Sequence, residues 1–310
     1  MSLHPPYAIA SLGGVVHGEF MLIQWYPGHM AKARRMLLEN LKLIDVVIEV
    51  VDARAPLATR NPDFDELFRL KERVIILNKS DLAEPERTKL WIKRYERERA
   101  RAIAFVATSQ SQRKAALALI ESAAGEQVKR MKLRGISKTV RVMVAGIPNV
   151  GKSTFINRIA GGVRAQAGDK PGVTKGKQWV KITPYLELMD TPGLLWPKLE
   201  DEILARRLAY IGSIKDDIMD VEQLAASLLS DLIAMVPGAV AARYKRALPD
   251  VPKDELLNAV CLSRGFVLSG GAPDTERAAR IVLDEYRAGK IARVTFDNPF
   301  GEEGTMDERQ

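Results

Sequence analysis

The order of three short polar loops constrains the fold of this chain more than any other feature of its sequence. The segment N-K-S-D stands at residues 78–81, G-I-P-N-V-G-K-S follows at 146–153, and D-T-P-G comes last at 190–193. In the usual arrangement of this set, the glycine-rich loop leads and N-K-x-D comes late. The set is complete here but rotated. A rotation leaves the assembled site intact if the strands keep their places, and it changes which loop is joined to the following domain.

The glycine-rich loop stands between a strand pattern and a helix pattern. Val140–Ala145 is a short apolar run rich in β-branched residues, and Ser153–Ala160 has a helical pattern. Glycines let backbone N–H groups close around a phosphate, and the following helix N-terminus attracts the anion. We predict that Lys152 reaches the β- and γ-phosphates and that the Ser153 hydroxyl binds Mg²⁺. The predicted phosphate-binding residues are Asn149, Val150, Gly151, Lys152, Ser153 and Thr154.

The N-K-S-D loop predicts that the base is guanine. It follows the apolar run Val74–Leu77, and a carboxylate at its tip can accept both the N1–H and the N2–H₂ of guanine, whereas adenine offers no such donor pair. This loop alone would be weak evidence, because polar turns often contain these residues. Together with the phosphate loop it assigns base binding to Asn78, Lys79, Ser80 and Asp81.

A third base-contacting loop is predicted at Thr108 and Ser109, which follow the apolar run Ile103–Val106. The same residues fit a helix start in which Ser109 acts as the N-cap, so both interpretations stay open.

The D-T-P-G segment predicts the remaining phosphate sensors. We expect Asp190 to hold Mg²⁺ through water and the Gly193 N–H to bond the γ-phosphate. Thr174 lies between the phosphate loop and this segment, where the first switch threonine of such a site belongs, as a ligand of nucleotide and metal. The alternative for Thr174 is an incidental threonine in a Pro-Gly turn. Leu194 stands where many P-loop hydrolases carry a water-orienting glutamine, so the catalytic group must come from elsewhere.

Three further segments, together with the rotated order, resemble the YlqF/RbgA family of circularly permuted ribosome-assembly GTPases. They are W-Y-P-G-H-M-A-K-A at 25–33, D-A-R-A-P at 52–56 and R-N-P at 60–62. The resemblance runs from about Gln24 to the end of the chain. It implies a cytoplasmic bacterial factor that acts late in assembly of the large ribosomal subunit, with rRNA and ribosomal proteins as partners. It also implies that His29 takes part in catalysis in place of glutamine, and that Asn149 is linked to stimulation by K⁺.

His29 has other interpretations from its residues alone. It follows a Pro-Gly turn and precedes the amphipathic stretch Met30–Leu41, which carries Lys32, Arg34 and Arg35. A histidine at such a place could cap the helix or contact RNA phosphate.

The pattern of elements predicts an α/β fold followed by a small all-α domain. Strand-like runs at 46–51, 74–77, 103–106, 140–145 and 186–189 alternate with helical stretches, as in a mostly parallel sheet covered on both faces. The segments 201–210, 221–235, 253–262 and 275–288 have helical patterns. We therefore expect a permuted P-loop GTPase domain over 21–199, a helical domain over 200–298 and a flexible tail over 299–310.

Composition excludes several classes of protein. The one cysteine, Cys261, rules out a disulfide framework, and no run is long and apolar enough to span a membrane. Residues 1–20 lack the basic front and long apolar stretch of a secretory signal. They also lie outside the family pattern, so we interpret them as a non-conforming extension and expect Met21 as the native start.

The positive charge is concentrated in the first two thirds of the chain. Residues 1–200 hold 33 lysines and arginines against 20 acidic residues, whereas residues 201–310 hold 14 against 19. Runs of basic residues fit contacts to rRNA phosphates and equally fit solvated helix faces. The candidates for RNA contact are Lys129, Arg130, Lys132, Arg134 and Lys138. Because the helical domain is acidic, a GTP-regulated switch that binds a protein remains the alternative function.

Overall fold

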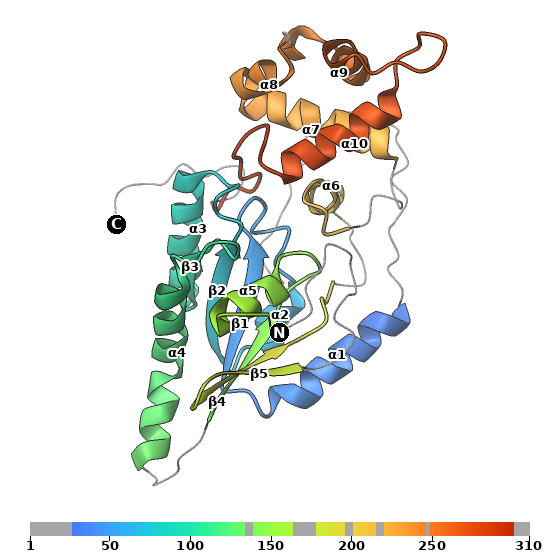
Figure 1. Ribbon diagram of the computed structural model, residues 1–310. Coiled ribbons are helices and arrows are strands. Elements are labelled where there is room, and N and C mark those ends of the chain that lie inside the picture. The colour runs from blue at the N-terminus through green and yellow to red at the C-terminus, as the bar shows by residue number, and fades with distance from the viewer. Residues whose placement is uncertain are drawn as a thin grey trace, which may run out of the picture.

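The computed structural model describes residues 27–133, 139–163, 178–195, 201–214, 220–245 and 248–300. A six-stranded sheet with helices on both faces forms one part of the molecule, and a group of helices stands at one end of it (Figure 1). The predicted α/β architecture followed by a helical region is confirmed. No helix in these ranges is long and apolar enough to cross a membrane.

The sheet is parallel apart from one edge strand. Its order is β3-β2-β1-β4-β6-β5, and only β5 runs antiparallel to its neighbour. The strands are β1 (Val46–Asp52), β2 (Glu72–Asn78), β3 (Arg101–Ala104), β4 (Val140–Ala145), β5 (Gln178–Thr183) and β6 (Leu186–Asp190).

This strand order brings the rotated loops together. The phosphate-loop strand β4 pairs with β1 on one side and with β6 on the other, and β2 follows beyond β1. Since the carboxyl ends of parallel strands meet at one edge of a sheet, the loops that follow β1, β2, β4 and β6 share that edge. The rotation has therefore moved the chain ends without separating the parts of the site.

Alternate residues of the buried strands face two separate layers of helices. Ile48 and Val50 pack with Phe155 on the face covered by α4 (Arg113–Leu133) and α5 (Lys152–Ala160). Val47 packs on the opposite face, with the side chains of α1 (Pro27–Leu41) and α2 (Asp63–Leu67). Val51 packs there against α3 (Pro85–Arg97). The period-two alternation of a strand buried on both sides accounts for this arrangement.

The helical region begins at a well-formed cap. The Asp201 carboxylate accepts hydrogen bonds from the backbone N–H groups of Ile203 and Leu204, and Asp220 and Asp274 cap two later helices in the same way. The elements are α6 (Glu202–Tyr210), α7 (Val221–Met235), α8 (Pro237–Tyr244), η2 (Leu248–Asp250), η3 (Lys253–Glu255), α9 (Leu256–Arg264) and α10 (Thr275–Arg287).

The helical region shares a hydrophobic core with the sheet. Phe296 contacts the rings of Tyr210 in α6 and Tyr286 in α10, with centroid distances of 5.4 and 5.8 Å. The same continuous cluster of buried residues includes Val50 of β1 and Phe155 of α5. The sheet and the helical region therefore pack against each other through one continuous hydrophobic core.

The segment after α10 returns to the sheet. The Phe296 N–H donates to the carbonyl of Arg54, and the Asp297 carboxylate accepts from the N–H groups of Leu57 and Ala58. Arg94 of α3 donates to the carbonyl of Pro299. These contacts anchor residues 296–299 along the loop that follows β1.

Some elements differ from the sequence expectation, among them the helix expected at 253–262, which lies at Leu256–Arg264 after the short turn η3. The edge strand β5 carried no recognisable signal, and α8 was not predicted, although Pro237 at its first turn is a common helix start. The strand expected at 103–106 lies at Arg101–Ala104, because its pairing with β2 ends at Ala104.

Candidate nucleotide-binding site

The phosphate loop has a backbone that only glycine permits at two places. Gly146 has a φ of +149°, and a Cβ there would come within 2.5 Å of the Val50 carbonyl oxygen. Gly151 has a φ of +95°, and a Cβ there would come within 2.3 Å of Asn78 Nδ2. The loop therefore lies tightly against β1 and the N-K-S-D loop, and α5 begins directly after it.

Lys152 is buried at the start of α5. Its Nζ donates a hydrogen bond of 2.8 Å to the Ile147 carbonyl in the same loop. Burial lowers the pKa of Lys152 to about 8, against the opposing effect of the nearby Asp190 carboxylate. A lysine with this pKa is still largely protonated at neutral pH, so it can meet a phosphate with its charge in place.

The predicted metal ligands lie side by side. Ser153 Oγ donates a hydrogen bond of 2.8 Å to Asp190 Oδ2, which joins the phosphate loop to the end of β6. A hydroxyl and a carboxylate are oxygen ligands of the kind that Mg²⁺ prefers. Gly193 lies against the same loop, since a Cβ there would come within 2.7 Å of the Pro148 nitrogen.

The N-K-S-D loop is bonded directly to the phosphate loop. Asn78 Nδ2 donates to the Val150 carbonyl at 2.8 Å, and Lys79 Nζ donates to the Asn149 carbonyl at 2.9 Å. Ser80 Oγ holds the third loop by donating to the carbonyl of Phe105. Asp81 is exposed at the tip, where its carboxylate can meet a base.

Thr108 and Ser109 lie beside the N-K-S-D loop. The neighbouring Ala107 N–H donates to Asn78 Oδ1 at 3.1 Å, and Arg158 of α5 donates to the carbonyls of Ala107 and Thr108. Ser109 Oγ accepts from the Ser111 N–H, and α4 begins only at Arg113. Ser109 therefore does not cap α4, and the contact of Thr108 and Ser109 with the base stays a prediction.

Asn61 is a site residue to which the sequence had assigned no role. Its Nδ2 donates a hydrogen bond of 3.0 Å to the carbonyl of Leu194, immediately after D-T-P-G. Leu194 is buried and also donates its N–H to the Gly146 carbonyl. Asn61 therefore fixes the path of the phosphate-sensing segment, and a buried asparagine in the R-N-P segment was the available signal.

Asp52 is the second residue whose role the sequence did not reveal. It is fully buried at the end of β1 and binds both Arg54 and Lys79, at 2.7 and 3.1 Å. Burial alone would raise its pKa, but the two cations outweigh burial and hold the pKa of Asp52 well below its usual range. A carboxylate that ends an apolar parallel strand marks the ligand edge, and that signal was present in the sequence.

Several predicted residues are described only in part. His29 lies in the first turn of α1, and Lys129, Arg130 and Lys132 lie in the last part of α4, where the structure defines the backbone alone. Thr174, Arg134 and Lys138 fall outside the described residues. Their predicted roles therefore stay predictions.

A known protein family matches part of this chain. The family described as "50S ribosome-binding GTPase" matches residues 141–242. The match begins within the phosphate-loop strand and leaves out N-K-S-D, which the rotation has placed earlier in the chain.

Similar proteins extend over nearly the whole chain. A ribosome biogenesis GTPase A of Bacillus cereus is 43% identical over 91% of this chain and 97% of its own length. A ribosome biogenesis GTPase A of Thermotoga maritima is 32% identical over 89% of this chain and 95% of its own. The crystal structure of GNP-bound YlqF from T. maritima matches with a TM-score of 0.64 and 29% identity, covering 86% of this chain and 98% of that one. The chain therefore belongs to the ribosome biogenesis GTPase A family and is a circularly permuted P-loop GTPase.

Proposed function

We propose that the protein binds and hydrolyses GTP while it acts on the precursor of the large ribosomal subunit in the bacterial cytoplasm. The observation that carries this proposal is the assembly of the N-K-S-D loop and the phosphate loop into one unit through Asn78 and Lys79. Relatives that match about nine tenths of the chain are named for ribosome biogenesis, which supports the choice of partner.

Mg²⁺ fits the donor set at the junction of α5 and β6. Ser153 would bind the ion directly and Asp190 through water, with Thr174 joining from the segment between β4 and β6. When bound, the ion would supply positive charge that offsets the negative charge of the phosphate oxygens. Dependence on Mg²⁺ is general among GTPases of this kind.

K⁺ is proposed as a second cofactor near Asn149. This asparagine has a positive φ of 61°, and its Nδ2 donates to the carbonyl of Gly212, which follows α6. Replacing K⁺ by Na⁺ is expected to lower turnover, and Asn149→Ala is expected to abolish the difference between the two salts. Equal turnover of the unmodified protein in both salts would refute the proposal that K⁺ is a cofactor.

Hydrolysis requires a group that Leu194 does not supply. Leu194 and Leu195 are both buried, in line with a structural role for these leucines. We propose that Lys152 stabilises charge on the γ-phosphate and that His29, at the start of α1, orients or deprotonates the attacking water. Leu37, further along α1, packs in the same cluster as Leu194, which supports a position of this helix beside the phosphate sensors.

The rotated order supports a mechanical link to the helical region. Asp201, which caps α6, comes eight positions after the end of D-T-P-G. Ordering of the γ-phosphate sensors can therefore change the orientation of the helices that follow. We propose that GTP favours a state docked on the precursor and that hydrolysis releases the protein.

The basic end of α4 is the proposed rRNA contact. Lys129, Arg130 and Lys132 belong to the end of this helix that lies far from the helical region (Figure 1). Arg134 and Lys138 continue the same run in the sequence. By contrast, Arg94 of α3 forms an ion pair with Glu98, and Arg101 of β3 forms one with Glu72. These ion pairs make both arginines weaker candidates for phosphate contact.

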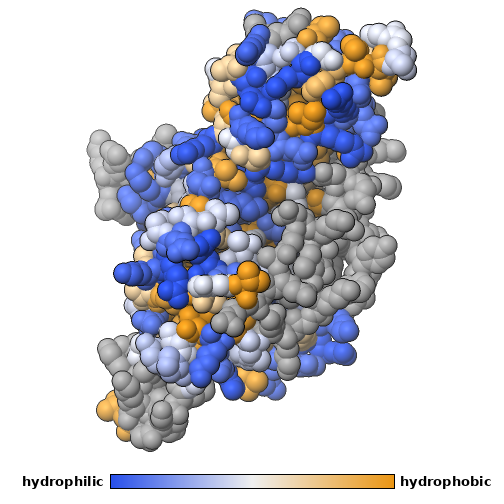
Figure 2. Space-filling model, in the orientation of Figure 1, coloured by the Kyte–Doolittle hydropathy of each residue, from blue (hydrophilic) through white to orange (hydrophobic). Residues whose placement is uncertain are grey.

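A protein-binding switch remains the second candidate because apolar residues are exposed at the far end of the helical region. Leu262 of α9 is 66% exposed, and Val267 and Leu268 in the following loop are 60% and 52% exposed. Figure 2 shows that this end of the molecule carries apolar spots within a largely hydrophilic surface. Such a mixture fits a contact with a folded protein better than one with RNA phosphates.

Sedimentation with ribosomal particles tests the proposal. The protein is loaded in turn with GDP and with a non-hydrolysable GTP analogue, then spun with large-subunit precursors. We expect stronger binding of the GTP form and faster hydrolysis with particles. A tenfold preference requires only about 1.4 kcal/mol of differential contact. Identical sedimentation in both states without stimulated hydrolysis would refute the proposal, and salt-insensitive retention by a ribosomal protein alone would favour the protein-binding switch.

A further inference from the structure

Lys79 is held from two sides in the N-K-S-D loop. Its Nζ donates to the carbonyl of Asn149 in the phosphate loop at 2.9 Å, and it pairs with the Asp52 carboxylate at 3.1 Å. Asp52 stands at the end of β1, outside every loop that the sequence assigned to the nucleotide. Because a lysine side chain has a flexible four-carbon stem, a fixed carboxylate behind it restricts where its ammonium group can lie.

The Asp52 carboxylate is itself fixed by Arg54. Arg54 donates to it from Nε at 2.9 Å, from a terminal guanidinium nitrogen at 2.7 Å and from its backbone N–H at 3.1 Å. Both side chains are 1% exposed. A forked, charge-assisted contact of this kind is both stronger and more specific in geometry than a neutral hydrogen bond. Asp52 therefore has a single defined place from which to hold Lys79.

Arg54 also contacts the helical region by three routes. Its guanidinium lies 5.6 Å from the centre of the Tyr286 ring in α10, and its backbone carbonyl accepts from Phe296. A guanidinium nitrogen also donates to the carbonyl of Arg287 at 3.5 Å, the longer of the two hydrogen bonds. The buried ion pair at the end of β1 is thus enclosed by α10 and the segment that follows it.

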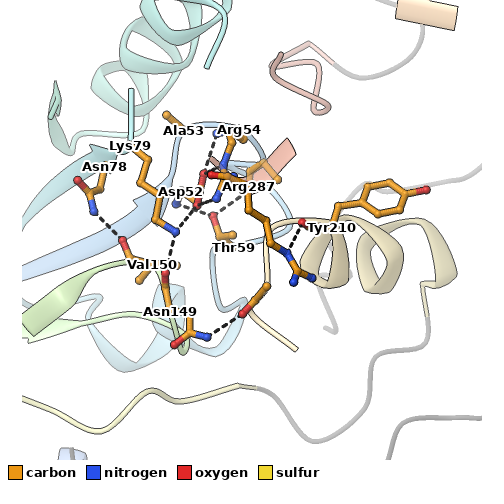
Figure 3. A network of polar contacts seen from close by, with 12 residues as sticks. Asp52, Ala53, Arg54, Thr59, Asn78, Lys79, Asn149, Val150, Tyr210 and Arg287 are labelled. Atoms are coloured by element: carbon orange, nitrogen blue, oxygen red, sulfur yellow. Dashed lines mark hydrogen bonds and ion pairs between the residues drawn. The ribbon is translucent and has the colours of Figure 1, made fainter. Parts of the chain in front are cut away.

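The contacts return from the helical region to the phosphate loop. The guanidinium of Arg287 donates to the carbonyls of Ala209 and Tyr210 at the end of α6. Two residues later, the Gly212 carbonyl accepts from Asn149 Nδ2 at 2.7 Å. Figure 3 shows Lys79 between Asn149 and Asp52, and Arg287 on Tyr210. The backbone from Tyr210 to Gly212 completes the path back to Asn149.

We propose that Asp52 and Arg54 are positioning residues of the nucleotide site, and that through them the helical region forms part of the support that holds Lys79 in place. This inference rests on the proposed role of Lys79 in nucleotide binding. It implies that nucleotide affinity depends on a carboxylate that belongs to none of the nucleotide loops. It also implies that a bound nucleotide and a well-seated helical region stabilise each other, because linkage between sites is reciprocal.

A double-mutant cycle tests the inference on the full-length protein. The affinity for GDP is measured by calorimetry for the unmodified protein, Asp52→Asn, Lys79→Met and the double variant. We expect Asp52→Asn to weaken GDP binding about tenfold, which corresponds to about 1.4 kcal/mol. In the Lys79→Met background the same change is expected to cost less than twofold, because its path to the nucleotide is already removed.

Asp297→Asn is the matched control. Asp297 is a buried carboxylate that joins the same two regions, but it binds Arg207 and the backbone of Leu57 and Ala58 instead of a nucleotide loop. It is expected to lower thermal stability while GDP affinity changes less than twofold. In turnover experiments, Asp52→Asn should raise KM for GTP and leave kcat within about twofold. A KM increase of the same size in Asp297→Asn would overturn the inference, because loosened packing would then explain both.

The outcomes distinguish a failure of this inference from a failure of the assignment of Lys79 to nucleotide binding. If Lys79→Met leaves GDP affinity unchanged, the assignment of Lys79 to the nucleotide fails and the inference fails with it. If Lys79→Met weakens binding but Asp52→Asn adds its full loss in that background, only the inference fails. Should Asp52→Asn not fold, Arg54→Lys replaces it, since a lysine keeps the charge beside Asp52 but cannot form the fork. We expect a loss of about threefold that disappears in the Lys79→Met background, and a persistent loss would again overturn the inference.

Discussion

The hydroxyl of Ser153 donates to the Asp190 carboxylate across 2.8 Å, so the phosphate loop and the end of β6 are joined at the place where the metal is expected. These two residues come from segments that are 37 positions apart in the chain. Their contact joins two of the three motifs because β4 and β6 are neighbours in the sheet, and Asn78 joins the displaced N-K-S-D loop to them by donating to the Val150 carbonyl.

Removing the Ser153 hydroxyl is expected to separate metal binding from nucleotide binding. In Ser153→Ala, the part of GTP affinity that depends on Mg²⁺ should fall, while affinity measured in the presence of a chelator should stay close to that of the unmodified protein. Titrations with and without Mg²⁺ measure both parts. If GTP affinity does not depend on Mg²⁺ in either protein, Ser153 is not a metal ligand.

Asp81→Asn is expected to change base preference. The exposed carboxylate would accept two charge-assisted hydrogen bonds from guanine, each worth roughly 1.5–3 kcal/mol. The variant should therefore bind GTP far more weakly and bind xanthine nucleotides better. Competition binding with GTP, ATP and XTP measures the change, and equal affinity of the unmodified protein for ATP and GTP would contradict the assignment.

Lys152 is expected to make nucleotide binding depend on pH. Burial lowers its pKa to about 8, whereas a bound polyphosphate favours the charged form, so binding takes up a proton above pH 8 and affinity falls as the pH rises. Calorimetry at pH 8.5 in buffers with different ionisation enthalpies measures that uptake. Lys152→Arg keeps its charge at every pH and should show none.

The lowered pKa of Lys152 has the opposite effect on the stability of the nucleotide-free protein, which should rise with pH where nucleotide affinity falls. Because the folded pKa is depressed, the unfolded chain binds more protons between pH 8 and the ordinary lysine pKa. Stability should therefore rise across this window relative to Lys152→Arg, and urea titrations at pH 7.5 and 9.5 compare the two proteins. A difference between them that does not change with pH would argue against a depressed pKa.

Asn61→Ala is expected to damage hydrolysis more than binding. The change leaves the Leu194 carbonyl without the donor that now holds it, at a cost of about 1–3 kcal/mol in the free energy of unfolding. Because D-T-P-G is the proposed sensor of the γ-phosphate, kcat should fall while affinity for GDP stays within a few-fold. Urea denaturation and single-turnover hydrolysis measure the two effects. A selective loss of GDP affinity would place Asn61 at the base or the β-phosphate.

His29→Ala is expected to lower turnover without weakening nucleotide binding. Loss of a positioned proton-transfer group typically costs about 10²–10⁴-fold in rate. Hydrolysis is measured with and without ribosomal particles, beside the affinities for GTP and GDP. Normal particle-stimulated turnover would reassign His29 to capping α1 or to contacting RNA.

The nucleotide loops were predictable because their chemistry dictates local sequence. Glycine at 146 and 151 is required where a Cβ would collide with a backbone oxygen or an amide, and Asp81 must project a carboxylate beyond a strand. The helix over Val221–Met235 was also predicted to the residue, since an aspartate cap and a long apolar pattern mark it. Local signals of this kind survive rotation of the chain.

Tertiary contacts were beyond the reach of the sequence. Arg54 is only two residues from Asp52, but Lys79 and the Arg207 partner of Asp297 come from other segments of the chain. A buried carboxylate looks like a solvated one until its partners are known. The edge strand β5 depends on pairing with β6 rather than on its own pattern. Asn61 was visible as part of a motif, but only the fold shows that it holds Leu194.

The return of residues 296–299 to the loop after β1 has a consequence for biosynthesis. The N–H groups of Leu57 and Ala58 find their acceptor in Asp297, and Trp91 of α3 donates to the Asp297 carbonyl. A ribosome translating this chain completes the whole sheet long before it adds these residues. A nascent chain that stops before residue 296 would therefore contain every nucleotide motif. The N–H groups of Leu57 and Ala58 would still lack the acceptor that Asp297 provides. The contacts that Asp297 makes to the loop after β1 and to α3 can therefore form only after residues 296–299 have been synthesised.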